Sequence, residues 1–278
     1  MIEISNLTFG YGQRPVFRNL SVNFKEGSIY GLLGENGVGK TTLLKLICSL
    51  QQSRHSNGTI KVDGMKPESR KPSFLENIFY VPDEIPVPKG TVMTFVKENG
   101  RFYPNFSMDV FLDFAKELEI DPRMSFRKMS FGQQKKAHLA FALSLGTKYL
   151  LMDEPTNGLD IPSKATFRSL IVRLSTENRI IIISTHQVKD VENVIDPIII
   201  LDKERVLLNA TIQQITDRLY FDYSGTVDET ALYREANAAG MIQVLPNVTG
   251  ADSKVNIEAL FNAVYRNKET IQSFFEKQ

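Results

Sequence analysis

The residues with the clearest capacity for chemistry lie in a glycine-rich segment, GENGVGKT, which runs from Gly34 to Thr41. It fits the pattern G-x-x-x-x-G-K-[ST], with a strand-like apolar stretch before it and a helix-like stretch after it. Backbone amides of such a loop, together with the helix N-terminus, bind phosphate oxygens. Lys40 adds a positive charge, and the Thr41 hydroxyl suits Mg²⁺. The sequence therefore predicts a nucleotide-binding loop whose expected contacts are Gly34, Asn36, Gly37, Gly39, Lys40, Thr41 and Thr42.

Two carboxylates form a second chemical group, at the end of the apolar segment YLLMDEP. A buried strand would deliver Asp153 and Glu154 at its C-terminal end. Asp153 would then hold Mg²⁺, directly or through water, while Glu154 would orient and deprotonate an attacking water. Taken alone the pair could merely end a strand, but beside a phosphate loop we favour the catalytic interpretation, with Lys40 as a further catalytic residue.

Alternating strands and helices must position these residues. Apolar patterns separated by glycine and proline predict strands at 2–9, 16–24, 28–33 and 59–63. A mainly helical insert is expected over about 91–145. Strands return at 148–153 and 179–184, joined by a crossover helix near 162–175. Their nearly continuous apolar runs are typical of a parallel sheet covered on both faces.

After Asp202 the sequence changes to mixed polar segments, with a loop-like stretch at 245–253 and a final helix candidate at 257–277. We interpret residues 203–278 as a small C-terminal accessory domain and residues 1–202 as the catalytic domain. The predicted fold class is α/β: a P-loop NTPase core with a parallel sheet, an antiparallel β subdomain, a helical insert and the accessory domain.

Composition narrows the classes of function. The chain has 33 basic and 32 acidic residues and a formal net charge of +1, so we expect no nucleic-acid partner. A single cysteine, Cys48, excludes an internal disulfide, and three scattered histidines form no zinc-ligand pattern. The apolar runs have strand length, whereas a membrane span needs roughly 20 residues. Because the N-terminus has neither a basic flank nor an apolar core, we expect a cytosolic location.

In their order and spacing these segments resemble the ABC ATPases, over about residues 1–202. The resemblance rests on Tyr11, the GENGVGKTT loop, MSFGQQKK at 129–136, YLLMDEPTNGLD at 149–160 and STH at 184–186. It implies ATP and Mg²⁺ as ligands and hydrolysis of ATP to ADP and phosphate.

The resemblance also implies roles for single residues. Tyr11 is similar to an aromatic that stacks on adenine, although an exposed edge-strand tyrosine is the alternative. His186 is similar to a catalytic histidine that contacts the γ-phosphate and steadies the water, the alternative being a histidine with no role. Asp160 is similar to the aspartate of a loop that crosses a dimer interface, and it could also cap the following helix.

The segment SFGQ resembles the family signature, which meets the γ-phosphate at a helix N-terminus through Ser130, Gly132 and Gln133. A capped helix start with no further role would have the same pattern. Phe131 replaces the usual glycine, and we expect its side chain to point away, with altered packing rather than lost function.

Another departure concerns the loop before the insert, where the family usually has glutamine and this chain has Asp83. A carboxylate can still bind Mg²⁺ or a metal-bound water, but it cannot donate a hydrogen bond when ionised. His55 and His138 match nothing in the family pattern, so surface or packing roles are expected for both.

The same resemblance implies partners. Two copies would bind two ATP molecules head to tail, each between the phosphate loop of one chain and the signature of the other. A separate integral-membrane permease would dock near Asp83 and residues 101–106, placing the chain peripherally at the cytoplasmic face of the cell membrane. The aromatics of RFYPNF could form that docking groove or pack inside the insert. Because segments at 102–120 and 255–267 resemble ATPases of bacterial exporters, we favour export over import.

Two rival functions remain. One is a soluble ABC ATPase that remodels a ribosomal or nucleic-acid complex; the second cassette, charged linker or long coiled coil typical of such proteins is not seen. The other is a catalytically silent module gated by ATP, suggested by Asp83 and Phe131. The intact Lys40, Glu154 and His186 argue against it.

Overall fold

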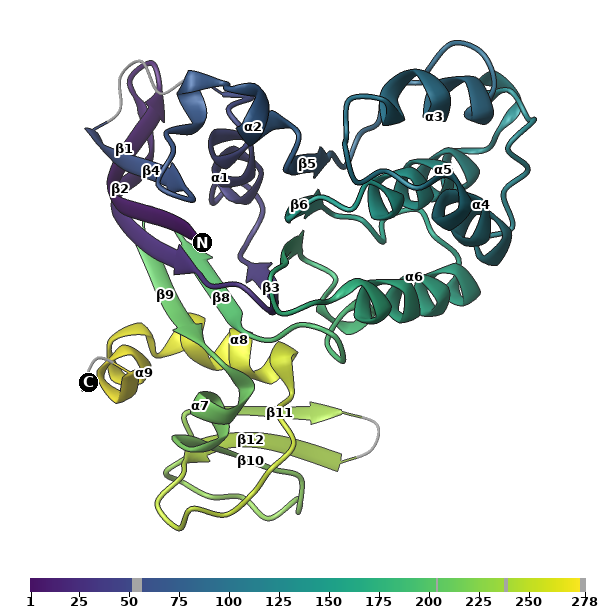
Figure 1. Ribbon diagram of the computed structural model, residues 1–278. Helices are drawn as coiled ribbons and strands as arrows, with labels where there is room; N and C mark the ends of the chain where they lie inside the picture. Colours follow the sequence, from purple (N-terminus) through teal and green to yellow (C-terminus); the bar gives the residue numbers. More distant parts are fainter. Residues whose placement is uncertain (52–56, 204, 238–239, 276–278) are drawn as a thin grey trace.

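A six-stranded sheet forms the centre of the protein across the residues described by the computed structural model, which are 1–51, 57–203, 205–237 and 240–275. Its strands follow the order β5-β6-β7-β3-β8-β9 (Figure 1). Their bounds are Ile78–Val81, Tyr149–Asp153, Ile180–Thr185, Ser28–Leu33, Ile198–Asp202 and Arg205–Ala210. All neighbours are parallel except β9, which forms an antiparallel hairpin with β8. The predicted α/β fold with a parallel sheet is confirmed.

Both faces of this sheet are buried. Successive residues of each strand point to opposite sides, and each set packs into a core of its own. Leu32, Leu151 and Ile182 belong to a core shared with helix α1 (Lys40–Ile47). Residues one position away, such as Leu33 and Leu150, belong to a core shared with helix α6 (Ile161–Leu174). This two-sided burial explains the apolar runs that predicted the strands.

The antiparallel β subdomain is a second sheet of β2 (Arg14–Phe24), β1 (Ile2–Tyr11) and β4 (Asn57–Val62), in that order. It lies over α1 and shares its core. Short helical turns follow, η1 (Pro67–Ser69) and α2 (Pro72–Leu75). The subdomain therefore brings the β1–β2 hairpin close to the start of α1.

The helical part comprises α3 (Val92–Gly100), α4 (Met108–Glu117), the turn η2 (Phe126–Lys128) and α5 (Phe131–Ser144). It projects from the β5 and β6 side of the sheet (Figure 1). Its centre is aromatic, and His138 stacks on Phe126 at a centroid distance of 5.1 Å. Burial lowers the pKa of His138 to about 4, so the ring stays neutral. His138 thus packs within the insert, whereas His55 lies outside the described residues.

The C-terminal segment adds a third sheet, which is small, and three helices below the central sheet (Figure 1). Its elements are α7 (Ile212–Thr216), β10 (Leu219–Asp222), β11 (Tyr233–Asn237), β12 (Gly240–Pro246), α8 (Ile257–Arg266) and α9 (Lys268–Phe275). Where one final helix was expected there are two, separated at Asn267. The Tyr265 hydroxyl donates to the Leu201 carbonyl at 2.6 Å, fixing α8 against β8. The division at residue 202 stays a prediction, and β9 belongs to the central sheet.

None of the helices formed by the described residues combines the length and the apolar character needed to cross a membrane.

Replacing Phe141 with alanine tests how strongly the insert depends on its aromatic core. The Phe141 side chain is 1% exposed and contacts the rings of Phe79 and Phe95 at centroid distances of 5.8 and 5.0 Å. We expect the free energy of unfolding to fall by about 3–5 kcal/mol, measured by urea titration. Phe102, which is 62% exposed, is the control, and its alanine variant should change the value by no more than ~0.5 kcal/mol. Equal losses in the two variants would contradict this account of the core.

Candidate active site

The phosphate loop joins β3 to α1, and its backbone depends on glycine at two positions. Gly37 and Gly39 have φ values of 85° and 105°, which L side chains rarely adopt. A Cβ on Gly39 would also lie 2.7 Å from the ring of Phe17. The Lys40 ammonium donates to the carbonyls of Gly34 at 2.6 Å and Glu35 at 3.0 Å. The loop is therefore curled around the cation that would meet the phosphates.

Burial lowers the pKa of Lys40, while the negative charges of Glu154 and Asp153 act in the opposite direction. The cation thus faces both carboxylates of the acidic strand. A bound phosphate would add further negative charge beside it and strengthen the protonated form.

Asp153 lies at the end of β6 and is held by hydroxyl groups from both sides. Thr41 donates its hydroxyl to Asp153 Oδ2 at 2.5 Å, and the Ser184 hydroxyl of β7 donates to Oδ1. The Tyr80 hydroxyl donates at 3.3 Å. A carboxylate and a hydroxyl in contact are oxygen donors of the kind that Mg²⁺ prefers, with its other positions left for water and phosphate. These two side chains fit the predicted metal site.

Glu154 follows directly and has a φ of 45°, a left-handed backbone conformation that costs energy in a non-glycine residue. Its carboxylate accepts from Thr185 Oγ1 and from the His186 amide, both at 2.9 Å. His186 Nδ1 lies 2.7 Å from Glu154 Oε1. Glu154, the predicted base, and His186, the predicted catalytic histidine, are thus in direct contact.

These groups surround a cavity of about 630 Å³ at the C-terminal edge of the sheet. Predicted residues that line it are Tyr11, Asn36, Gly37, Gly39, Lys40, Thr41, Thr42, Asp83, Asp153, Glu154 and His186. The sequence interpretation missed Arg14, Pro15 and Val16, which line the same cavity. Their one available signal was that they follow Tyr11 in the β1–β2 hairpin.

Tyr11, the predicted partner of an adenine ring, lines this cavity. Its hydroxyl is 3.3 Å from Thr42 Oγ1, and its ring meets Phe9 edge to face at 5.2 Å. The ring is half exposed. This position suits stacking on a base, and Arg14 on the neighbouring strand adds a cation.

The signature residues do not line this cavity. Ser130 caps α5 by accepting from the Gln133 amide at 3.3 Å, and Gln133 Oε1 accepts from the Ser130 amide at 2.9 Å. This reciprocal pair is a capping box. Asp160 caps α6 by accepting from the Ser163 amide at 2.8 Å, and hydrogen bonding from the Ser163 side chain, followed by its amide, lowers the pKa of Asp160. The capping interpretations of both segments therefore hold in the folded chain.

Phe131 and Gly132 pack against the loop that follows the catalytic carboxylates. A Cβ on Gly158 would lie 2.4 Å from Phe131 Cε1, and a Cβ on Gly132 would lie 2.8 Å from the Gly158 carbonyl oxygen. The Phe131 ring is half exposed and covers Gly158. The signature segment still forms its capping box, and the Phe131 ring changes how this segment packs against Gly158.

Asp83 lines the cavity, but the partners of its carboxylate are two residues that do not line it. Its carboxylate accepts from Asn157 Nδ2 at 3.0 Å and lies 3.5 Å from the Lys135 ammonium. Lys135 also donates to the Asp83 carbonyl at 2.8 Å. The Lys135 side chain is fully buried, and this burial lowers its pKa while Asp83 opposes the shift. The residue that replaces glutamine is thus paired with a cation from the signature helix.

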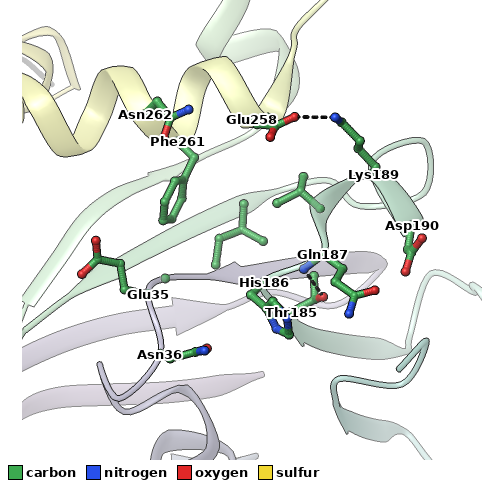
Figure 2. A pocket seen from close by; sticks show the side chains of 13 residues that line it. Glu35, Asn36, Thr185, His186, Gln187, Lys189, Asp190, Glu258, Phe261 and Asn262 are labelled. Atoms are coloured by element: carbon green, nitrogen blue, oxygen red, sulfur yellow. Dashed lines mark hydrogen bonds and ion pairs between the residues drawn. The ribbon is translucent and has the colours of Figure 1, made fainter. Parts of the chain in front are cut away.

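A second cavity, of about 580 Å³, is lined by Gly34, Glu35 and Asn36 of the phosphate loop and by residues of α8 (Figure 2). Glu258 and Phe261 of α8 face the segment 185–190, which follows β7 and contains the turn η3 (Val188–Asp190). Lys189 and Glu258 form an ion pair at 2.8 Å across it. The Tyr265 hydroxyl accepts from the Glu35 amide at 3.3 Å. Helix α8 therefore contacts both the phosphate loop and the segment that carries His186.

Comparison with known proteins agrees with this geometry. The sequence model of the family described as ABC transporter matches residues 17–157, more than half of the chain. The chain belongs to the ABC transporter family. It is an ATP-binding subunit of that family and an ABC ATPase.

Individual relatives point the same way. The ABC transporter ATP-binding protein YtrB of Bacillus subtilis is 31% identical over 194 residues, 69% of this chain and 65% of that protein. The chain thus spans just under two thirds of that relative. The bacitracin transport ATP-binding protein BcrA of Enterococcus faecalis is 29% identical over 78% of this chain and 71% of its own. A solved dimeric ATP-binding cassette in a post-hydrolysis state has a TM-score of 0.67 and 22% identity, covering 76% of this chain and 99% of its own.

Lys40→Ala tests the phosphate loop of this ABC ATPase. The substitution removes a charged donor, and such a bond contributes about 1.5–3 kcal/mol. We expect affinity for ATP to fall by roughly 10- to 100-fold, measured by equilibrium dialysis with labelled ATP. Lys45→Ala, on the same helix but outside the cavity, should bind ATP like the unmodified chain. Unchanged affinity in Lys40→Ala would exclude this loop as the phosphate site.

Proposed function

We propose that this protein hydrolyses ATP to drive a separate membrane permease, as an exporter, through dimerisation that depends on ATP. The observation that carries the proposal is the composition of the 630 Å³ cavity. It gathers the phosphate loop, the acidic strand end and His186, while Ser130, Gly132 and Gln133 lie outside it.

Within the cavity each side chain has a distinct task. Lys40 and the loop amides bind the phosphates, and Tyr11 stacks on the base. Thr41 and Asp153 would hold Mg²⁺, which would supply positive charge beside the phosphates. Glu154 accepts a proton from the attacking water at its carboxylate. His186, now bonded to Glu154, donates to the γ-phosphate once ATP is bound.

The dimer is proposed because the signature segment of one chain does not line the nucleotide cavity of the same chain. The capping box engages the Ser130 and Gln133 amides, and the remaining first-turn amides at the N-terminus of α5 suit an anion. Because one chain does not bring these amides to its own cavity, a second copy related by a twofold axis would supply them. The neighbouring solved cassette is itself dimeric and binds ADP and phosphate, which supports this arrangement. ATP would act as a ligand shared by two chains, and its hydrolysis would release them.

The surface of the insert supports the permease proposal. Phe102 is largely exposed with Arg101 over its ring at 5.0 Å, whereas Tyr103 and Phe106 pack against the core. Of the three aromatics of RFYPNF, Phe102 therefore lies outward with Arg101 and suits a partner, whereas Tyr103 and Phe106 pack inward and support it. We propose that a cytoplasmic helix of the permease docks here, with the ATPase at the cytoplasmic face of the membrane. Similarity to a bacitracin transport protein supports a role in transport.

Glu154→Gln tests the proposed base. The amide keeps the size and hydrogen-bonding reach of the side chain but does not take a proton, so turnover should fall by roughly 10²–10⁴-fold. ATP binding should be retained, and the dimer should accumulate with magnesium ATP, measured by light scattering after size exclusion.

Glu177→Gln, in an exposed turn, is the control and should leave turnover and mass unchanged. Unchanged turnover in Glu154→Gln would remove Glu154 as the base. A strictly monomeric Glu154→Gln chain under saturating magnesium ATP, with or without its permease, would contradict the dimer proposal.

The ion pair of Asp83 and Lys135 joins the segment after β5 to α5, and Asn157 of the loop after Glu154 donates to the same carboxylate. Removing the Asp83 charge leaves a buried ammonium bonded only to carbonyl groups. We expect Asp83→Asn to lower the free energy of unfolding by about 1–3 kcal/mol. In a Lys135→Met background the same change should cost much less, with a coupling energy of at least ~0.5 kcal/mol. Urea titration of the two single variants and the double variant measures this; additive effects would show that the charges are independent.

A further inference from the structure

Another pocket, of about 410 Å³, lies where β6 and β7 begin, at the opposite end of these strands from the nucleotide cavity. Lys148 and Arg179 immediately precede these strands, and the Ile180 amide donates to the Lys148 carbonyl at 2.9 Å. The two cationic residues are therefore neighbours on adjacent parallel strands. Thr147 and Arg173 also line this pocket, which we call the strand-start pocket.

Arg179 is the unusual member of the strand-start pocket. Its side chain is only 6% exposed, and Nε and Nη2 are buried without a hydrogen-bond partner among the described residues. Burial lowers the pKa of Arg179 to about 10, which still leaves the guanidinium charged at neutral pH. A buried charge without a partner is costly, and such groups normally bind an opposite charge.

Thr147 presents a second unused donor in the same pocket. It is 1% exposed, and its Oγ1 also lacks a partner within the described part of the chain. A hydroxyl and the edge of a guanidinium fork are the two kinds of donor that recognise the oxygens of a small anion. Two independent buried groups thus point to the same ligand chemistry.

The carboxylates near this pocket are already engaged by other cations. Glu26 accepts from Lys148 at 2.7 Å and from the N-terminal ammonium at 2.9 Å. Arg173 pairs with Glu117 at 2.7 Å. Glu26 is the acidic residue that lines the pocket, against Lys148, Arg173 and Arg179. The lining therefore has an excess of positive charge, and Arg179 carries the part that is not paired.

We propose that the strand-start pocket binds a small tetrahedral oxyanion, such as phosphate or sulfate. Because Nε and Nη2 of Arg179 and Oγ1 of Thr147 lie just beneath the surface of the pocket, binding would require these side chains to turn toward the ion. The guanidinium edge of Arg179 would then hold two of its oxygens, the Thr147 hydroxyl a third, and Lys148 would add attraction. The volume admits such an ion together with water, each water occupying about 30 Å³.

Binding there would add a link between the insert and the start of the central strands. Asn105 and Gly146 line the pocket from the insert side, and Asn105 Nδ2 donates to the Gly146 carbonyl at 3.4 Å. Residues 145–148 join α5, the signature helix, to β6. An oxyanion between Thr147 and Arg179 would fasten this connection to β7 and stabilise the insert against the core.

The test measures thermal unfolding of the full chain at constant ionic strength, in chloride or in phosphate, with ADP saturating the nucleotide cavity. We expect phosphate at several times its dissociation constant to raise Tm by roughly 2–4 °C. Arg179→Met should abolish the rise, whereas Arg123→Met, an exposed arginine outside the pocket, should retain it. The rise should persist in Lys40→Ala, which separates it from phosphate at the nucleotide site.

An equal rise in Arg179→Met and the unmodified chain, or no rise in the unmodified chain, would overturn the proposal. If Arg179→Met does not fold, Arg179→Lys keeps a charge but loses the fork, and its phosphate affinity should fall about tenfold or more. Equilibrium dialysis with labelled phosphate measures that change, and an unaltered affinity would also overturn the proposal. Neither measurement depends on ATP turnover.

Discussion

The arrangement of the catalytic residues at the C-terminal edge of the sheet depends on Asp153. Its carboxylate accepts hydrogen bonds from two hydroxyl groups, one located after β3 and one near the end of β7. Thr41 lies in the first turn of α1, which follows β3, and Ser184 belongs to β7. Strands β6, β7 and β3 are consecutive and parallel, so their C-terminal ends reach one edge of the sheet. A shift of one residue in any register would turn these side chains to the other face. The buried apolar strands therefore fix the catalytic geometry as well as the core.

Glu154 adds a conformational element to that edge. In the structure its carboxylate is occupied by the Thr185 hydroxyl, the His186 amide and the His186 ring, and its backbone is left-handed. A carboxylate with three partners is poorly placed to take a proton from water. If His186 turns to the γ-phosphate of ATP, one of these partners leaves and Glu154 becomes available. The contact between His186 and Glu154 would then make activation of the base depend on the substrate.

The sequence predicted what is local and periodic, because those properties are written in adjacent residues. The phosphate loop needs glycine at positions of positive φ, and a strand buried on both faces needs an apolar run, as in Ile180–Thr185. Contacts between distant residues leave no such pattern. Lys135 is 52 residues from Asp83 in the sequence. Nothing in the sequence around Lys135 distinguishes it from an exposed lysine on a helix. The break at Asn267 was missed because the apolar pattern continues through both C-terminal helices.

The two departures from the family pattern meet at one loop, the segment 154–160 between β6 and α6. Asn157 of this loop donates to Asp83, and Gly158 accommodates the ring of Phe131. A side chain on Gly158 would collide with that ring, and an unpaired Asp83 would leave the buried Lys135 without its carboxylate. The substitutions are therefore not isolated losses. Each departure is matched by a contact to the loop that runs from Glu154 to Asp160. A movement of the insert would therefore be transmitted directly to these two residues.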